Sequence, residues 1–276
     1  MTTLRDIVKY LKDIAPQELT FQGRESRVEV GPQTERDQAK TTISRVTIAT
    51  YASAKIVATA SQSKANLLVT HRPLFPFAVD RLTGLDLIRA RLLAKNYISA
   101  YVIGSAWIGV EGGLSDSLVE SLDLSTVREF MTYGDYNQMV PIGRECEPPS
   151  EMNHSRLVNY VAEKLSIDTV LFAGNLDDDV GRILVSPGFY IDMPEILRAK
   201  QQDIGTIITG ELSPEIRLLA NEENLNTVEL GGFVSEEPGM KRLGHQFRME
   251  MPELKIGFVE SAPLARALRP YSEDMK

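Results

Sequence analysis

Residues 44–71, SRVTIATYASAKIVATASQSKANLLVTH, contain the pattern that indicates the fold of this chain. The hydrophobic pattern predicts a strand over 44–50, a helix over 52–64 and a second, more fully buried strand over 66–70. A helical crossover of this length joins parallel strands. The stretch therefore predicts a strand–helix–strand unit of the α/β class.

The second half of the chain repeats this order. Strand, helix and strand are predicted in GRILVSP, DMPEILRAKQQ and IGTIITGE, which span residues 181–187, 192–202 and 204–211. Val46 and Val69 in the first unit are 23 positions apart, and Ile183 and Ile207 in the second are 24 apart. We interpret the nearly equal spacing as an internal duplication, which predicts an α/β fold with two similar halves.

The ends of the second strands are the places to look for a site. His71 follows NLLVT, and Gly210 follows TIIT. Ligands of parallel sheets collect at the carboxyl ends of the strands. We therefore expect both strands to be buried and both ends to face a cleft between the halves.

Composition excludes several functional classes. A net charge of −8 and a pI near 5.1 oppose a general nucleic-acid surface, which needs clustered Lys and Arg. The single cysteine, Cys146, is interpreted as a structural thiol and fits a reducing compartment, so a cytoplasmic location is expected. The histidines His154 and His245 have no ligand spacing to other residues and are expected to be structural or exposed.

The N-terminus is expected to be part of the folded body. Charged residues separate apolar ones that share one helical face, namely Leu4, Ile7, Val8, Leu11 and Ile14. Thr3 and Asp6 are typical of a helix start. Elsewhere no apolar run reaches the length that spans a bilayer, so we expect no membrane association.

A connection rich in Gly and Pro, GRECEPPS at 143–150, is interpreted as the boundary between the halves. Asn153 is then predicted to cap a helix. The chain is expected to be one unit over 1–276, with halves at 1–143 and 151–265 and a mobile tail at 266–276.

Four sequence blocks resemble a known family. In order and spacing, LLVTHRPLF, YVIGSAWIGVEGGLSDSLVESLDL, TIITGELSPE and VELGGFVSEEPGM are similar to the signature blocks of the NIF-three-like proteins, which are also known as GTP cyclohydrolase I type-two homologues. The resemblance covers nearly the whole chain. It implies two interwoven α/β halves, a pair of metal ions between them, and frequently a ring-shaped homo-oligomer.

The metal ligands that the resemblance implies are mostly replaced. His71 matches the first of two adjacent family histidines, but Arg72 stands in place of the second. Ile108 stands in place of an aspartate and Gly232 in place of a histidine, whereas Glu236 matches the family glutamate. Two of five ligands remain, and two donors cannot hold two metal ions. The sequence predicts a degenerate metal site.

Arg72 brings a permanent cation to this position. Because a cation repels a metal ion and attracts a carboxylate, we expect a metal-free polar cluster. Arg72 is expected to pair with Glu236, or otherwise with Glu211 or Glu229. His71 is expected to be a hydrogen-bonded histidine of the cleft.

Two functions follow from these residues. The first is a non-catalytic binding or assembly protein without a cofactor, whose ligand is a protein partner or a small anion. The alternative is a metal-dependent hydrolase of the GTP cyclohydrolase type-two kind, with one zinc, manganese or iron ion held by His71 and Glu236. The apolar stretch PLFPFAV at 73–79 also predicts a homo-oligomer, because such exposed segments are usually covered by a partner.

Overall fold

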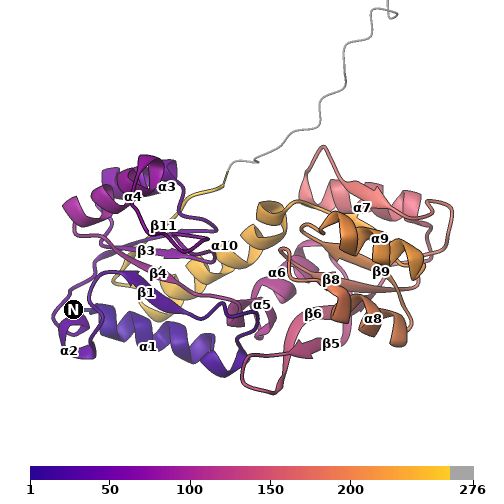
Figure 1. Ribbon diagram of the computed structural model, residues 1–276, viewed down its shortest axis with the longest axis horizontal. Coiled ribbons are helices and arrows are strands. Elements are labelled where there is room, and N and C mark those ends of the chain that lie inside the picture. The colour runs from indigo at the N-terminus through magenta and orange to yellow at the C-terminus, as the bar shows by residue number, and fades with distance from the viewer. Residues whose placement is uncertain (262–276) are drawn as a thin grey trace, which may run out of the picture.

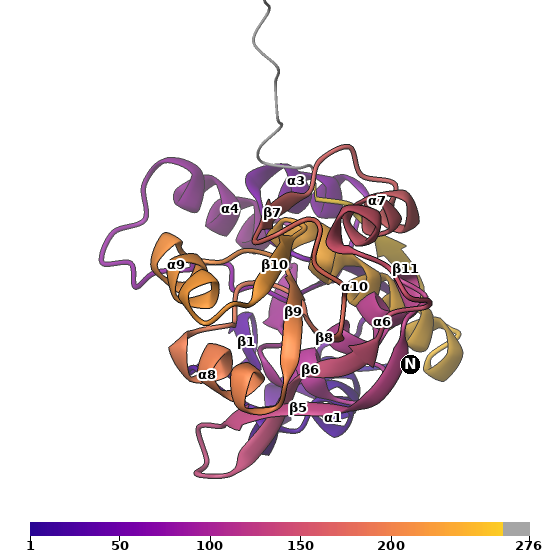
Figure 2. The same cartoon turned by 90° about the vertical axis from the view of Figure 1, so that its right-hand side faces the viewer.

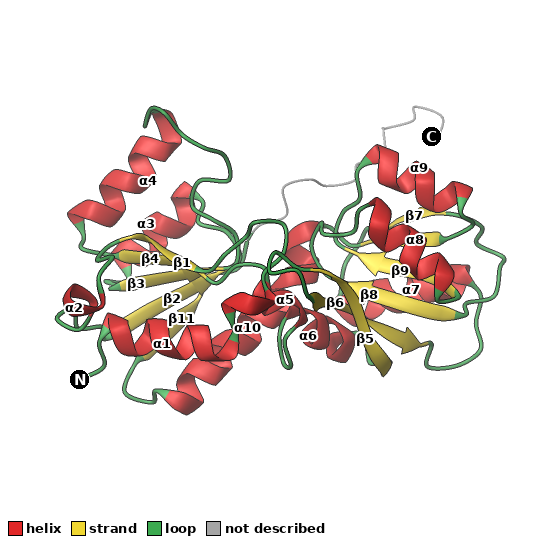
Figure 3. Cartoon of the chain, turned by 60° about the horizontal axis from the view of Figure 1, so that its bottom comes forward, coloured by secondary structure: helices red, strands yellow, loops and turns green. Residues whose placement is uncertain are grey.

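A computed structural model describes residues 1–261 of the chain, so the predicted tail at 266–276 lies outside the described residues. Two β-sheets lie side by side, each between layers of helices, and a long helix runs from one to the other (Figure 1). This helix, α10 (Gly232–Glu250), lies with α5 (Ala106–Gly109) and α6 (Leu114–Ser121) in the middle of the molecule (Figure 3).

The first sheet has five strands in the order β1-β4-β3-β2-β11. Its strands are β1 (Arg27–Val30), β2 (Arg45–Ala49), β3 (Leu67–Thr70), β4 (Ser99–Val102) and β11 (Lys255–Phe258). The helices before and between them are α1 (Leu4–Ile14), the 3-10 helix η1 (Gln17–Leu19), α2 (Glu35–Gln38), α3 (Ala54–Gln62) and α4 (Gly84–Lys95).

Both faces of this sheet are covered. Val46 and Val69 belong to the same apolar cluster as residues of α1 and α10, whereas Leu68 belongs to a cluster with residues of α3 and α4. Strand side chains alternate between faces, so neighbouring residues of β3 enter different layers. This is why LLVT is apolar throughout its first three positions.

The second sheet has six strands in the order β5-β6-β8-β9-β10-β7. Its strands are β5 (Ser125–Tyr133), β6 (Met139–Glu147), β7 (Leu171–Ala173), β8 (Arg182–Ser186), β9 (Ile204–Thr209) and β10 (Asn226–Glu229). α8 (Met193–Gln201) and α9 (Pro214–Glu222) lie on one face, and α6 and α7 (His154–Leu165) lie on the other (Figure 2).

The two predicted strand–helix–strand units are present. β2 pairs with β3 in parallel, and β8 pairs with β9 in parallel, with α3 and α8 as the crossovers. The prediction of an α/β fold with two similar, interwoven halves is confirmed. The N-terminal helix is also present, and Thr3 and Asp6 form a capping box at its start.

The boundary between the halves differs from the expectation. β5 and β6 cover most of 125–147 and pair in the second sheet, so the sheets divide before Ser125 rather than at 143–150. β11 (Lys255–Phe258) returns to the first sheet, although the sequence placed these residues in the second half. Gly143 lies inside β6, and Pro148 and Pro149 follow the end of this strand directly, so the segment is no linker between the halves. Local composition indicates where a strand ends but not which sheet the strand joins.

Two other features agree with the sequence. Asn153 caps α7 by accepting a hydrogen bond from the backbone of Arg156. Within residues 1–261, no helix combines the length and the apolar character needed to cross a bilayer.

Candidate functional site

The candidate site lies where the carboxyl ends of strands from both sheets meet the first turns of α10. His71 and Arg72 follow β3, whose four residues are all buried. Gly210 follows β9, and a side chain there would meet Ser235 of α10 and the backbone of Gly188. The two strand ends therefore approach the same helix from opposite halves, because α10 lies between the sheets.

Arg72 and Glu236 form a bidentate ion pair. The Arg72 Nε and Nη2 atoms each donate a hydrogen bond of 2.9 Å to one oxygen of Glu236. The Arg72 side chain is 19% exposed and that of Glu236 is 0% exposed. Burial raises the pKa of Glu236, but the fixed charge of Arg72 opposes this, and we infer that the pair is ionised at neutral pH.

Two glycines leave room for this pair. Gly188 has φ +82°, and a Cβ there would lie 2.7 Å from Oε1 of Glu236. A Cβ at Gly232 would lie 2.5 Å from Nη2 of Arg72. The guanidinium of Arg72 thus fills space that a side chain at position 232 would need.

His71 is buried next to the pair. Its Nε2 lies 2.9 Å from the hydroxyl of Tyr190 and 3.8 Å from Oε1 of Glu236, while its Nδ1 has no hydrogen-bond partner within residues 1–261. Burial and the charges of Arg72 and Arg24 lower the pKa of His71 to about 3. The imidazole is therefore neutral at physiological pH.

Tyr190, Phe189 and Arg24 belong to the site but were missed in the sequence. Burial, and then the charge of Glu236, raises the pKa of Tyr190, so its hydroxyl keeps its proton. The guanidinium of Arg24 lies 4.4 Å from the ring centre of Phe189 and 5.0 Å from that of Tyr190. The sequence could have indicated the two aromatic residues, because they follow the predicted strand that became β8. Ligand sites collect at the carboxyl ends of parallel strands, and this holds for β8 as well as for β3 and β9.

Arg72 also stacks on aromatic rings from the second half and from α10. Its guanidinium lies 4.4 Å from the ring centre of Phe189 and 5.3 Å from that of Phe233, and Phe233 stacks on Tyr51. A cation over an aromatic face gains about 0.5–2 kcal/mol when water is partly excluded. Arg72 therefore connects the two halves through both charge and stacking.

The other two predicted carboxylates have different places. Glu211 accepts a hydrogen bond of 2.8 Å from the backbone of Gly232 and lies near Arg72, although the two form no ion pair in the described part of the chain. Glu229 forms a bidentate ion pair with Arg217 and accepts a hydrogen bond from the backbone of Leu212. Glu229 is thus not a partner of Arg72, because a nearer arginine on α9 neutralises it.

The remaining histidines and the cysteine lie outside the cluster. His154 is buried, and its ring nitrogens lie 2.8 Å from the carbonyl of Asp178 and 2.8 Å from the hydroxyl of Thr206. His245 is exposed on α10. Cys146 is free and buried, and burial raises the pKa of its thiol to about 12.

The donors around His71 do not fit a two-metal centre. Both oxygens of Glu236 accept hydrogen bonds from Arg72, and Nε2 of His71 is hydrogen-bonded to Tyr190. Within residues 1–261, no three His, Cys, Asp or Glu side chains are grouped so that they could hold a metal ion. A divalent ion needs about four or more donors, which this cluster does not offer.

The sequence profile of the family described as Duf34/NIF3 (NGG1p interacting factor 3) matches residues 2–263. The chain belongs to the Duf34/NIF3 family. A relative named "GTP cyclohydrolase 1 type 2 homolog", from Clostridium perfringens, is 28% identical over 267 residues, which cover 94% of this chain and 95% of the relative. The homologue of the same name from Clostridium acetobutylicum is 23% identical and covers 86% of each chain.

Solved structures have the same fold. A Bacillus cereus protein related to NIF3 superposes with a TM-score of 0.81 at 16% identity, covering 97% of this chain and 99% of the other. Reduced HcgD from Methanocaldococcus jannaschii superposes with a TM-score of 0.75 at 20% identity, covering 94% and 98%. The NIF3 fold of this chain is therefore shared over almost its full length.

Proposed function

We propose that this NIF3-family protein is a non-catalytic binding or assembly protein, in which the ion pair between Arg72 and Glu236 replaces a dinuclear metal centre. The observation that carries the proposal is the bidentate ion pair, in which Arg72 donates two hydrogen bonds of 2.9 Å to the two oxygens of Glu236. A guanidinium there engages both oxygens of Glu236 and places a fixed positive charge beside them, which repels a metal ion. Gly232 supports the same proposal, because the family histidine at this position would displace Arg72.

The ion pair has a physical role in such a protein. Arg72 follows β3 of the first sheet, Phe189 follows β8 of the second, and Glu236 belongs to the helix between them. A pair of metal ions would hold these elements together through coordinate bonds. Here hydrogen bonds and stacking do so, and the halves stay fixed without a metal cofactor.

The metal content of the protein tests the proposal. We expect less than about 0.1 zinc, manganese or iron per chain when the protein is purified without chelator and without added metal, because two donors give weak binding. Inductively coupled plasma mass spectrometry measures this ratio. The variant Arg72→His should also stay below one metal per chain, since it returns only one of three lost ligands.

The alternative is a hydrolase with one divalent ion held by His71 and Glu236. The observation in its favour is their proximity, with Nε2 of His71 3.8 Å from Oε1 of Glu236. This ion would have to displace Arg72 from the carboxylate. Stoichiometric metal that is lost on substituting His71→Gln would support the hydrolase and contradict the metal-free proposal.

Assembly is the second part of the proposal, and it concerns an apolar patch on the first half. Large apolar side chains are exposed there over the loop before α4 and its first turns: Phe77, Val79, Leu82, Leu85, Leu87 and Ile88. Phe77 is 82% exposed and Leu85 is 66% exposed. Exposed apolar groups gathered in this way are typical of a protein–protein interface. We propose that this α4 patch binds a second copy of the chain.

Light scattering tests the assembly. We expect a mass that is a multiple of the 30.7 kDa monomer at micromolar concentration, and a shift towards the monomer for Phe77→Ser with Leu85→Ser. The control is Tyr97→Ser, because Tyr97 is 89% exposed but lies beyond the other end of α4. A monomer at every concentration would contradict the proposed association.

A further inference from the structure

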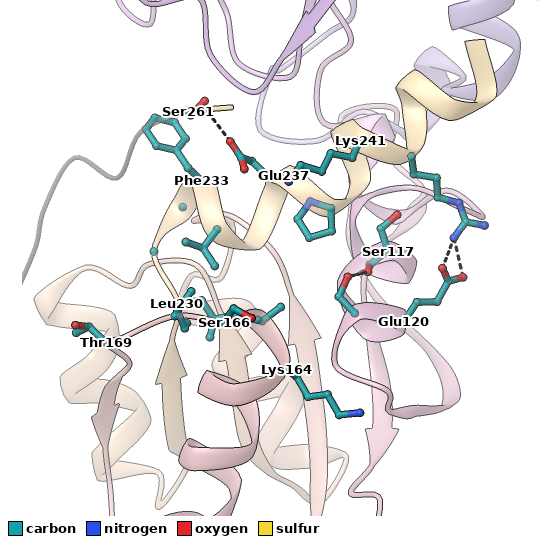
Figure 4. Close-up of a pocket in the computed structure, with 18 of the residues that line it drawn as sticks. Ser117, Glu120, Lys164, Ser166, Thr169, Leu230, Phe233, Glu237, Lys241 and Ser261 are labelled. Carbon is teal, nitrogen blue, oxygen red and sulfur yellow. Dashed lines mark hydrogen bonds and ion pairs between the residues drawn. The ribbon is translucent and has the colours of Figure 1, made fainter. Parts of the chain in front are cut away.

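A surface groove lies beside the site, on the other side of Phe233 and Gly232. It has a volume of about 1510 Å³ and runs between α6, the segment that follows α7, and α10 (Figure 4). Leu165, Ile167 and Val234 provide apolar lining. Residues of α6 and α10 line one side of the groove, and residues 164–169 line the other.

The chain itself leads into this groove. After β11, Glu260 pairs with Lys241 of α10 at 2.9 Å, and the backbone of Ser261 donates a hydrogen bond of 2.5 Å to Glu237. The chain therefore follows α10 from Lys241 back towards the amino end of the helix. Ser261, the last described residue, lines the groove next to Phe233 (Figure 4).

The charges of the groove favour a basic occupant. Its lysines and arginines already have carboxylate partners: Lys164 with Asp123, Lys241 with Glu260, and Arg242 with Glu120. By contrast, three acids of the lining have no ion-pair partner within residues 1–261, namely Asp168, Glu211 and Glu237. A segment with positive charge would compensate them.

Residues 262–276, APLARALRPYSEDMK, have the matching chemistry. Arg266 and Arg269 supply two positive charges before the first acid, Glu273. Leu264 and Leu268 supply apolar side chains for the lining. An extended chain covers about 3.3 Å per residue, so Leu268 reaches up to about 23 Å from Ser261, which is long enough to follow the groove.

We propose that residues 262–276 bind in the groove between α6, α7 and α10 of the same chain. The tethering at Ser261 gives the segment a high effective concentration there, which a separate peptide lacks. The bound segment covers Gly232 and Phe233, which separate the groove from Arg72. It is therefore an intramolecular occupant that a partner protein must displace before it reaches this face.

Disulfide trapping in the full chain tests the proposal. The natural Cys146 does not interfere, because it is buried and its thiol pKa is raised to about 12. Leu268→Cys is combined with Ser166→Cys in one variant and with Thr169→Cys in another, both on the groove wall. The control combines Leu268→Cys with Tyr97→Cys, and Tyr97 is an exposed residue just after α4 in the other half.

We expect the disulfide to form at least tenfold faster in one groove variant than in the control, at a rate independent of protein concentration. Adding Arg266→Glu and Arg269→Glu should slow trapping at least threefold, whereas Lys276→Glu should not. Equal rates in both groove variants and the control would overturn the proposal. Disulfides that join only two different chains would overturn it as well, and would assign the groove to the segment of a second copy.

Discussion

The variant Arg72→Ala is expected to lower the free energy of unfolding by about 3–5 kcal/mol, which is the usual cost of leaving a buried charge without its partner. Glu236 is 0% exposed, and within residues 1–261 no second Lys or Arg forms an ion pair with it. Nε2 of His71 lies 3.8 Å away, but this imidazole is neutral. The carboxylate must then take up a proton or draw in water. Denaturation with urea at pH 7, followed by circular dichroism, measures the loss.

Matched variants separate the charge from the volume of the side chain. Arg72→Lys keeps the charge but loses the bidentate hydrogen bonding to Glu236 and the stacking on Phe189. We therefore expect an intermediate decrease in the free energy of unfolding. Arg72→Ala with Glu236→Ala removes both charges, and its loss should be smaller than the sum of the two single losses. Lys164→Ala breaks an exposed pair with Asp123 and should leave stability nearly unchanged.

An Arg72→Ala variant as stable as the natural protein would contradict the proposed role of the pair. It would mean that another group neutralises the negative charge of Glu236 in the variant. A gain of one metal ion in this variant would have a different meaning, because removing the cation also frees both oxygens of Glu236. Metal analysis of the same preparation distinguishes these results.

Acid is expected to destabilise the protein through His71, which is the second large effect. Its pKa is about 3 in the folded chain, against the ordinary 6.5 of an unfolded one. Below pH 6.5 the unfolded state therefore binds a proton that the folded state does not bind. The stability from His71 is present above pH 6.5 and is lost as the pH falls towards 3, with a slope of about 1.4 kcal/mol per pH unit.

Unfolding by urea at pH 7 and at pH 5 measures this slope. We expect His71 to contribute a loss of about 2 kcal/mol between these values, and the variant His71→Gln to lack it. The effect of Glu236 on the same curve is largely shared by both proteins and cancels in the comparison. His245→Gln is the control, because His245 is exposed and should leave the pH dependence unchanged. Equal slopes for the natural protein and His71→Gln would show that His71 is protonated in the folded state.

The sequence determined the units of this fold because their signals are local. The buried strand LLVT, the crossover helix α3 and their repeat as β8, α8 and β9 follow from hydrophobic pattern and helix caps within about 25 residues. The need of Arg72 for an acidic partner could also be predicted from the sequence near it. A guanidinium beside a buried strand end requires a carboxylate, and the family blocks limited the candidates to a few acids.

Only the tertiary structure decided which acid and which aromatic residues meet Arg72. Glu236 was the first candidate in the sequence and Glu229 an alternative. Arg217, twelve positions before Glu229, neutralises that acid, whereas Glu236 meets Arg72 from 164 positions away. β11 likewise joins β2 across about 210 residues, which no local pattern indicates. The physical reason is that hydrophobic periodicity and caps act within one element, while the pairing of distant elements depends on the packing of the whole chain.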